Sequence, residues 1–195
     1  MKYEKVYSSK KLFFNGPLLI TPNIFQDERG YFYESWNQKL FNNILSKSIS
    51  FCQDNHSKSS KGVLRGLHYQ TEPLSQGKLI RTTIGVIFDV IVDLRKYSPT
   101  FGEWAGVELD DITKNQLWIP DGFAHGFLTL SDFAEVQYKT TNYWSKNYEK
   151  TILWNDDQLN IIWPLEKLIK QKPIISSKDM LGNSLEFMKK SGFVF

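Results

Sequence analysis

The pattern of apolar and polar positions predicts a chain built mainly from short β-strands. Its clearest stretch is residues 79–94, where apolar side chains recur at every second position from Phe88 to Leu94. Such alternation places successive side chains on opposite faces of a strand. The shorter strand candidates are residues 18–21, 31–36, 105–109, 116–119, 126–130 and 134–140. Several short strands separated by turn residues, such as Ser98-Pro99-Thr100, predict an antiparallel sandwich or barrel.

Helices play a smaller part in this pattern. Residues 38–45 carry apolar side chains at helical spacing, which predicts one short helix. Residues 46–60 are polar apart from Ile49 to Phe51, and their Ser- and Lys-rich end is predicted to be a loop. After Pro164 the Lys-rich chain predicts helical or irregular segments, whereas residues 182–195 match no recognised pattern. The predicted fold class is therefore all-β dominated, with a few short helices, mainly N- and C-terminal.

Length, charge and aromatic content limit what this chain can be. At 195 residues it is long enough for one domain with a sizeable core, so we assign residues 1–195 to a single domain. The net charge is only +3 and no long basic block is present, which argues against nucleic acid as a partner. Six Trp, nine Tyr and fourteen Phe suit a β-rich core and a pocket that stacks on rings.

Cysteine usage and the absence of long apolar runs predict the compartment. Cys52 is the only cysteine, so no intrachain disulfide can form, as expected in a reducing cytosol. Residues 1–5 lack the apolar core of a signal peptide, and no apolar run approaches transmembrane length. We therefore expect a cytoplasmic protein that does not insert into a membrane.

The strongest chemical signal lies in Arg65-Gly66-Leu67-His68, which Lys78 follows ten residues after the histidine. This stretch puts two cations near a titratable imidazole, and a second imidazole, His125, follows Asp121-Gly122. A hydrogen next to a ketone is weakly acidic, so its removal needs a positioned base and a group that stabilises the enolate oxygen. A His base beside Arg and Lys can supply both. The ordinary alternatives are a hydrogen-bonded structural His and surface cations.

Many ordered segments resemble the dTDP-4-dehydrorhamnose 3,5-epimerase family, the sugar-nucleotide epimerases of the cupin fold. They lie between about residues 18 and 180 and comprise residues 26–30, 53–57, 65–70, 76–78, 88–90, 98–102, 118–126, 138–143, 154–156 and 176–179. The resemblance implies a jelly-roll cupin barrel and a homodimer in which N-terminal strands cross to the partner's sheet. It also implies a dTDP-linked 4-keto-6-deoxy sugar as substrate, a reaction without a cofactor, and a place in L-rhamnose supply for surface polysaccharide.

The resemblance also implies catalytic roles. His68 matches the family's base, Tyr138 its proton donor, and Lys78 and Arg65 are the candidates for binding the enolate oxygen. Asp179 matches the carboxylate that orients the base and supports its protonated form.

Without the resemblance, the residue pattern leaves the orienting carboxylate open. Asp156 and Asp157 are as eligible as Asp179, and a solvated loop carboxylate is the usual state of any Asp. Tyr143 similarly competes with Tyr138, because a Tyr in a strand is usually structural.

Contacts with the nucleotide are implied for a further set of residues. They are Phe25, Arg29, Glu34, Gln53, Asn55, His125, Tyr143 and Trp144. Arg29 matches a diphosphate contact, to which a guanidinium fork is well suited. The chain departs from the family in having Asn142-Tyr143-Trp144 where Asn-Tyr-Tyr is common, and Gln137 where an apolar residue usually precedes the donor Tyr. Trp144 can still stack on a base, whereas the identity of the nucleotide and sugar stays open.

Other functions compete with this interpretation. Metal-binding cupins usually have His-x-His and a Glu in their first motif, whereas this chain has His68-Tyr69-Gln70. Two His without a well-placed carboxylate fall short of the usual three protein ligands, so we expect no metal. The alternatives are an epimerase that inverts only C3 or only C5, a metal-dependent cupin oxygenase, and a sugar-nucleotide-binding cupin without turnover.

Overall fold

The computed structural model describes residues 1–168 and 172–195. One sheet contains β1 (Lys2–Tyr7), β2 (Phe13–Thr21), β5 (Gln53–Ser60), β7 (Lys78–Ile84), β10 (Gln116–Ile119) and β12 (Phe133–Thr140). Another contains β6 (Val63–Gln70), β8 (Val86–Asp93), β9 (Trp104–Asp110), β11 (Phe123–Thr129), β13 (Glu149–Thr151) and β14 (Ile174–Ile175). A separate hairpin is formed by β3 (Phe25–Asp27) and β4 (Gly30–Phe32). The helical segments are α1 (Gln38–Leu45), the 3₁₀ turn η1 (Leu165–Leu168), α2 (Ser177–Met180) and α3 (Leu185–Lys190).

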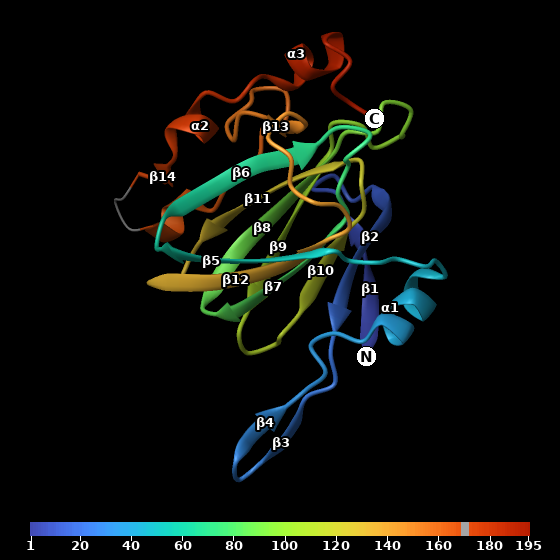
Figure 1. Ribbon diagram of the computed structural model, residues 1–195. Coiled ribbons are helices and arrows are strands. Elements are labelled where there is room, and N and C mark those ends of the chain that lie inside the picture. Colours follow the sequence, from blue (N-terminus) through green and yellow to red (C-terminus); the bar gives the residue numbers. More distant parts are fainter. Residues whose placement is uncertain (169–171) are drawn as a thin grey trace.

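The two larger sheets face each other as the walls of a barrel (Figure 1). The first has the order β1-β2-β10-β7-β12-β5, and the second has the order β13-β6-β11-β8-β9 with β14 beside β6. Sequence neighbours such as β5 and β6 thus lie in different sheets, as in a jelly roll. The predicted all-β jelly-roll fold with a few short helices is confirmed.

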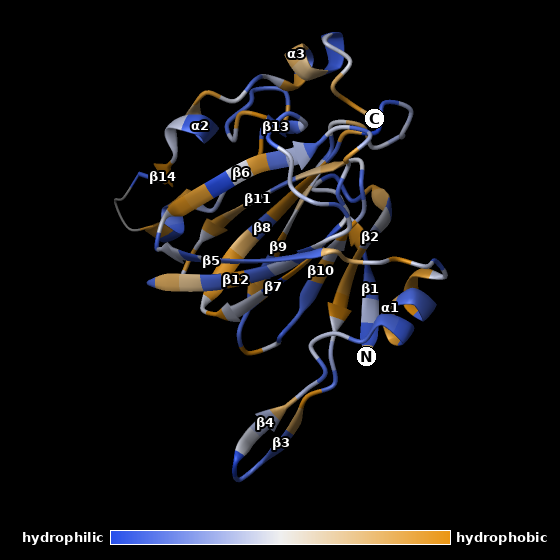
Figure 2. Ribbon diagram, in the orientation of Figure 1, coloured by the Kyte–Doolittle hydropathy of each residue, from blue (hydrophilic) through white to orange (hydrophobic). Residues whose placement is uncertain are grey.

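Strand β8 explains why the longest β signal in the sequence is almost continuously apolar. Ile87 and Ile91 face the barrel interior, where they pack with residues of the opposite sheet such as Ile80 and Leu117. The alternate residues of β8 pack instead against the C-terminal segment that covers the outside of this sheet. A strand covered on both faces needs apolar side chains on both, and the orange colour of the central strands in Figure 2 follows from this.

Two outer layers complete the core. Helix α1 buries Phe41 on the first sheet, in contact with Trp118 and Phe51. Residues 182–195, which had no assignment from the sequence, bury Leu185 and Met188 of α3 on the second sheet. The backbone of Phe195 then pairs with Leu94, its N–H lying 3.0 Å from that carbonyl oxygen. This final segment is therefore part of the core.

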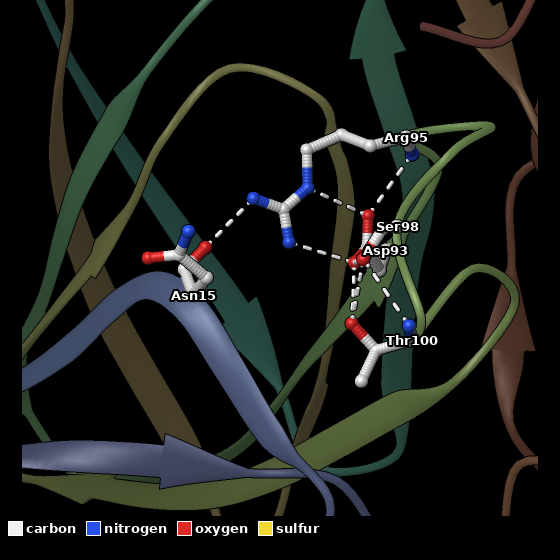
Figure 3. A network of polar contacts seen from close by, with 5 residues as sticks. All are labelled: Asn15, Asp93, Arg95, Ser98 and Thr100. Carbon is white, nitrogen blue, oxygen red and sulfur yellow. Dashed lines mark hydrogen bonds and ion pairs between the residues drawn. The ribbon is translucent and has the colours of Figure 1, made fainter.

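A buried carboxylate fixes the connection between β8 and β9 (Figure 3). Asp93 accepts hydrogen bonds from the guanidinium and backbone N–H of Arg95 and from the hydroxyls of Ser98 and Thr100, at 2.6–2.9 Å. Arg95 reaches on to the carbonyl oxygen of Asn15 at 2.7 Å. A buried charge that is saturated in this way stabilises the loop, and the Ser-Pro-Thr motif is thereby explained as structural.

Two sequence predictions were wrong in detail, whereas the β segment at residues 79–94 is confirmed. The polar stretch predicted to end in a loop is β5, whose half-buried and exposed residues alternate. Of residues 31–36 only Tyr31 and Phe32 are strand, as the end of β4, because the chain forms an isolated hairpin there and then turns. Residues 79–94 are two strands joined at Gly85, which has φ +81°. A Cβ there would lie 2.3 Å from the carbonyl oxygen of Phe133, so this turn requires glycine.

Candidate active site

A cleft of about 730 Å³ opens between β6 and β11 on one side and β5, β7 and β12 on the other. We call this space the cleft. The sequence-predicted residues that line it are Gln53, Asn55, Arg65, His68, Lys78, His125, Tyr138, Trp144 and Asp179. The structure thus brings together residues from segments more than a hundred positions apart. A cleft with a few convergent polar groups is the usual form of a small-molecule site.

His68 and Asp179 form a hydrogen-bonded pair in the cleft. Nε2 of His68 lies 2.6 Å from Oδ1 of Asp179, and the N–H of Gly66 donates to Oδ2 of the same carboxylate at 3.2 Å. Burial favours the protonated carboxyl, but the hydrogen bond and charge of His68 outweigh it, so the pKa of Asp179 is held below its usual value. The carboxylate is therefore ionised and orients the imidazole through this hydrogen bond.

The local fold explains how Asp179 reaches His68. Strand β14 runs parallel to β6, pairing Ile174 with Val63 and Ile175 with Leu64. The chain then turns into α2, where the hydroxyl of Ser176 accepts from the N–H of Asp179 at 3.1 Å. A Ser cap of this kind contributes about 1 kcal/mol to a helix start. The strand pairing and the helix cap together direct the Asp179 carboxylate toward Gly66 and His68 of β6.

Lys78 lies at the first position of β7, almost fully buried in the wall of the cleft. Its Nζ donates to the carbonyl oxygen of His68 at 3.2 Å. Burial lowers the pKa of Lys78 to about 8, although the charges of Glu149 and Asp89 oppose this shift. The ammonium is thus present at neutral pH and sits beside the imidazole. A desolvated cation in this place is suited to binding a developing enolate oxygen.

Arg65 is the second predicted cation. Its Nε donates to the hydroxyl of Ser59 at 3.0 Å, which links β6 to β5. Arg65 is an exposed residue, but its guanidinium is hydrogen-bonded at the cleft wall.

Tyr138 lines the cleft from β12, a strand of the sheet opposite His68. Burial and the charge of Glu149 raise the pKa of Tyr138, against a smaller opposing effect of Arg65. The phenol therefore keeps its proton at neutral pH. A base on one wall and an acid on the facing wall can act on opposite faces of one bound sugar ring.

Sequence reasoning missed a second imidazole–carboxylate pair, in which His125 lines the cleft and the buried Asp89 does not. Nε2 of His125 lies 2.8 Å from Oδ2 of Asp89, and the two residues occupy neighbouring strands. Burial raises the pKa of Asp89 and lowers that of His125, although each partner opposes the shift of the other. Asp89 is fully buried, and within the described residues its other oxygen, Oδ1, has no hydrogen-bond partner. The sequence signal that could have revealed this pair is the presence of Asp89 within the largely apolar strand β8.

Glu149 is the second residue that the sequence did not identify. It lines the cleft from β13 and forms an ion pair with Lys178 at 2.6 Å. Its pairing with β6 places it opposite Gln70. The short polar segment around Glu149 gave no sign that this residue differs from a solvated carboxylate. Glu149 reaches the cleft only because β13 pairs with β6.

The predicted binding residues at the rim form a connected group. Gln53 and Asn55 point into the cleft from β5, linked by a hydrogen bond of 2.8 Å. The backbone N–H of Trp144 donates to Oε1 of Gln53 at 2.9 Å, and its half-exposed indole stands at the rim. Tyr143 is exposed and does not line the cleft. Trp144 is therefore the better placed of the two for stacking on a base.

Three predicted binding residues lie outside the cleft altogether. Phe25, Arg29 and the exposed Glu34 belong to the hairpin β3–β4 or to the chain just after it, which we call the arm (residues 25–34). Figure 1 shows this hairpin extending away from the barrel. The side chain of Arg29 is 85% exposed and pairs with Asp27 at 2.5 Å. Within one chain the arm residues do not meet His68.

The competing carboxylate Asp156 has a structural place. It accepts from the N–H groups of Gln158 and Leu159 and from that of Leu185, each at 3.0 Å. It thus fastens α3 to the loop that precedes it. Among residues 1–168 and 172–195, no group of three or more His, Cys, Asp or Glu side chains is placed to hold a metal ion. Nor is any helix in that part of the chain long and apolar enough to cross a membrane.

Fold and site together define an epimerase of the isomerase class, built on a cupin-type jelly roll. The family model for dTDP-4-dehydrorhamnose 3,5-epimerase matches residues 11–186. The chain belongs to the dTDP-4-dehydrorhamnose 3,5-epimerase family, and the resemblance identified from its motifs is confirmed.

Individual relatives agree with this assignment. The dTDP-4-dehydrorhamnose 3,5-epimerase of Shigella flexneri is 57% identical over 165 residues, covering 85% of this chain and 88% of the relative. The dTDP-6-deoxy-D-glucose-3,5-epimerase of Legionella pneumophila, solved with dTDP-4-keto-L-rhamnose, is 41% identical with a TM-score of 0.89, covering 99% and 97%. A 3'-monoepimerase of Streptomyces bikiniensis, solved with dTDP-quinovose, is 29% identical with a TM-score of 0.85, covering 92% and 88%.

Proposed function

We propose that this chain converts dTDP-4-dehydro-6-deoxy-D-glucose into dTDP-4-dehydro-L-rhamnose by inverting C3 and C5 of the sugar. The observation that carries the proposal is the His68–Asp179 pair at 2.6 Å facing Tyr138 across one cleft. Identity is 57% to a 3,5-epimerase and 29% to a 3'-monoepimerase, which supports inversion at both centres. A cytoplasmic place in L-rhamnose supply agrees with the lone Cys52.

The proposed reaction follows from the chemistry of a ketone at C4. His68 removes the proton from the neighbouring carbon, and the Asp179 carboxylate stabilises the imidazolium that results. The electron pair moves onto the C4 oxygen, which the Lys78 ammonium and the Arg65 guanidinium stabilise. The phenol of Tyr138 then protonates the same carbon from the other face, which inverts it. His68 then releases its proton to solvent and Tyr138 regains one from solvent, which resets both groups. Repetition at the second carbon, on the other side of C4, gives the doubly inverted product.

The test is incubation of the protein with the dTDP-4-keto sugar in deuterated water, with the product analysed by NMR. We expect one deuterium at C3 and one at C5, together with inverted stereochemistry at both. Deuterium at one centre alone would replace the proposal with a single-centre epimerase. Binding without exchange would indicate a non-catalytic sugar-nucleotide-binding protein.

We further propose that the working form is a homodimer in which each arm completes the partner's cleft. Phe25 is 62% exposed and Arg29 also faces solvent, away from the cleft of their own chain. Residues that bind nucleotide from this position must therefore do so in a second copy. An exchange of identical elements about a twofold axis satisfies both copies at once.

Mixed dimers test this proposal sharply. His68→Ala removes the base from one chain, and Arg29→Ala removes the arm contact from the other. Co-expression at equal levels makes half of the dimers mixed, and each mixed dimer then has one intact site. At low substrate concentration we expect recovery of about a quarter of the wild-type activity. Activity that equals the average of the two separate variants would contradict arm exchange.

A further inference from the structure

The arm is tied to the barrel by a lysine to which neither the motifs nor the cleft assigns a role. Lys114 lies in the turn between β9 and β10, and its Nζ donates to the hydroxyl of Tyr31 at 3.1 Å. The same nitrogen lies 4.5 Å from the centroid of the Tyr31 ring, within the range of a cation–π contact. Lys114 is only 6% exposed, although Tyr31 is 59% exposed. Lys114 is thus the buried partner of this contact, and Tyr31 is the exposed one.

The turn itself holds Lys114 in place. Oδ1 of Asp110 accepts from the N–H groups of Ile112 and Thr113, at 2.8 and 2.7 Å, and Oδ2 accepts from the hydroxyl of Thr113 at 2.9 Å. Lys114 follows in the left-handed region, with φ 56°, a conformation uncommon for a residue with a Cβ. A turn hydrogen-bonded in this way presents the ammonium in one direction, which is toward the arm.

The arm needs such a tie. Its strands pair only with each other among the described residues, through Phe25 with Phe32, Gln26 with Tyr31 and Asp27 with Gly30. An isolated two-stranded hairpin is at best marginally stable in water. Tyr31 is two residues from Arg29, so any change in the direction of this strand moves the guanidinium. A displacement of this kind weakens a bidentate contact with phosphate, which depends on geometry.

We propose that Lys114 is a positioning residue, which sets the direction of the arm through Tyr31 and thereby delivers Arg29 to the dTDP group in the partner's cleft. This inference rests on the proposed function, because it assumes that the arm binds nucleotide in a second copy. It adds that the accuracy of that delivery is controlled from the β9–β10 turn, outside the cleft.

The test compares Lys114→Met, Lys114→Arg, Tyr31→Phe and the double variant Lys114→Met/Tyr31→Phe. We expect Lys114→Met and Tyr31→Phe each to raise KM, and the Kd for dTDP, by about threefold to tenfold while kcat changes little. Lys114→Arg keeps a cation above the ring and should recover most of the loss. The double variant should be no worse than Lys114→Met, because Lys114→Met already removes both the hydrogen bond to the Tyr31 hydroxyl and the contact with its ring.

Measurements of folding and of Arg29 separate the possible outcomes. Thermal melting and light scattering show whether each variant is a folded dimer; if Lys114→Met is not, Tyr31→Phe, which removes a single hydroxyl, decides the matter. Wild-type KM and dTDP affinity in a folded Tyr31→Phe protein would overturn the role of Lys114. If Arg29→Ala weakens dTDP binding in that same experiment, arm exchange survives and only this inference fails. If Arg29→Ala also has no effect, the proposed role of the arm fails with it.

Discussion

The cleft and the arm hold their functional side chains in opposite ways. In the cleft, Asp179 is hydrogen-bonded to His68, to the backbone of Gly66 and through its own N–H to Ser176. In the arm, Arg29 is 85% exposed and its side-chain hydrogen bonds are to Asp27, two residues away. Proton transfer tolerates little error in distance, whereas a diphosphate that does not react needs only to be held. We therefore predict that the cleft residues set the rate and that the arm residues set the affinity.

Among the cleft variants, loss of the base His68 should have the largest effect on kcat. His68→Ala should lower kcat about 10³-fold or more and abolish deuterium exchange at both C3 and C5. Asp179→Asn should cost about 10²-fold, because the imidazolium loses its counter-charge. The matched control is His56→Ala, since His56 is half-exposed on the outer face of β5 and pairs with Glu135. Near-normal exchange in folded His68→Ala would move the base elsewhere.

Loss of the acid should divide the reaction into its two halves. Tyr138→Phe keeps the ring and removes the proton donor, so deprotonation by His68 should continue. We expect exchange at C3 to persist while the C5-inverted product falls about 10²-fold. Exchange and product stereochemistry should be measured on the same sample, with Tyr143→Phe as the control outside the cleft. Doubly inverted product at the wild-type rate from Tyr138→Phe would make Tyr138 structural.

These two regions also differ in how much the sequence reveals. Apolar alternation located β8 because it packs on a core, and helical spacing predicted the bounds of α1 to the residue. Strand β5 was missed because its inward residues, such as Gln53 and Asn55, face the cleft and are polar. Figure 2 shows the hydrophilic colour along β5. A strand that lines a polar site lacks the apolar period by which strands are recognised.

Pairings between distant segments were beyond reach of the residue pattern. Asp179 could be selected over Asp156 by resemblance, but the physical reason is the parallel pairing of β14 with β6. Asp89 was hidden in a strand whose other inward residues are Ile87 and Ile91. Its buried partner, His125, is 36 positions away. Local sequence does not encode which strands become neighbours, so such pairs appear only in the folded chain.

Arg29→Ala tests the arm side of the comparison and should act on affinity. The variant loses charge-assisted hydrogen bonds to a group that does not react, so we expect KM and the Kd for dTDP to rise about 10- to 100-fold with little change in kcat. Lys47→Ala, at an exposed position after α1, is the control for loss of a surface cation. Unchanged dTDP affinity with much lower kcat would place Arg29 among the rate-setting residues and remove the distinction drawn above.

Asp89→Asn is expected to have a smaller effect, which is a change in the pH dependence of kcat. Lys78 must be protonated to stabilise the enolate oxygen, so activity should fall as pH rises through its pKa of about 8. Asp89 and Glu149 both raise that pKa. Without the charge of Asp89 the pKa of Lys78 should fall, so the decrease of kcat at alkaline pH should move to lower pH by roughly one unit.

Two further variants control this pH experiment. Glu149→Gln should move the alkaline limb in the same direction, since its charge also supports Lys78. Asp54→Asn should leave it in place, because Asp54 is exposed and pairs with Lys139. An alkaline limb that stays fixed in both Asp89→Asn and Glu149→Gln would mean that it does not report Lys78.

The smallest expected effect is that of chelation, which should leave turnover unchanged. His68 and His125 each use Nε2 to bind a carboxylate, Asp179 and Asp89 respectively. A metal on either Nε2 would break such a pair, and a metal on Nδ1 would still lack the usual three protein ligands among the described residues. We expect equal kcat/KM before and after exhaustive dialysis against a chelator, with no stoichiometric transition metal in the purified protein. Lost activity that one added metal restores would show that the cleft works as a metal centre, and proton abstraction by a His68–Asp179 pair would no longer describe it.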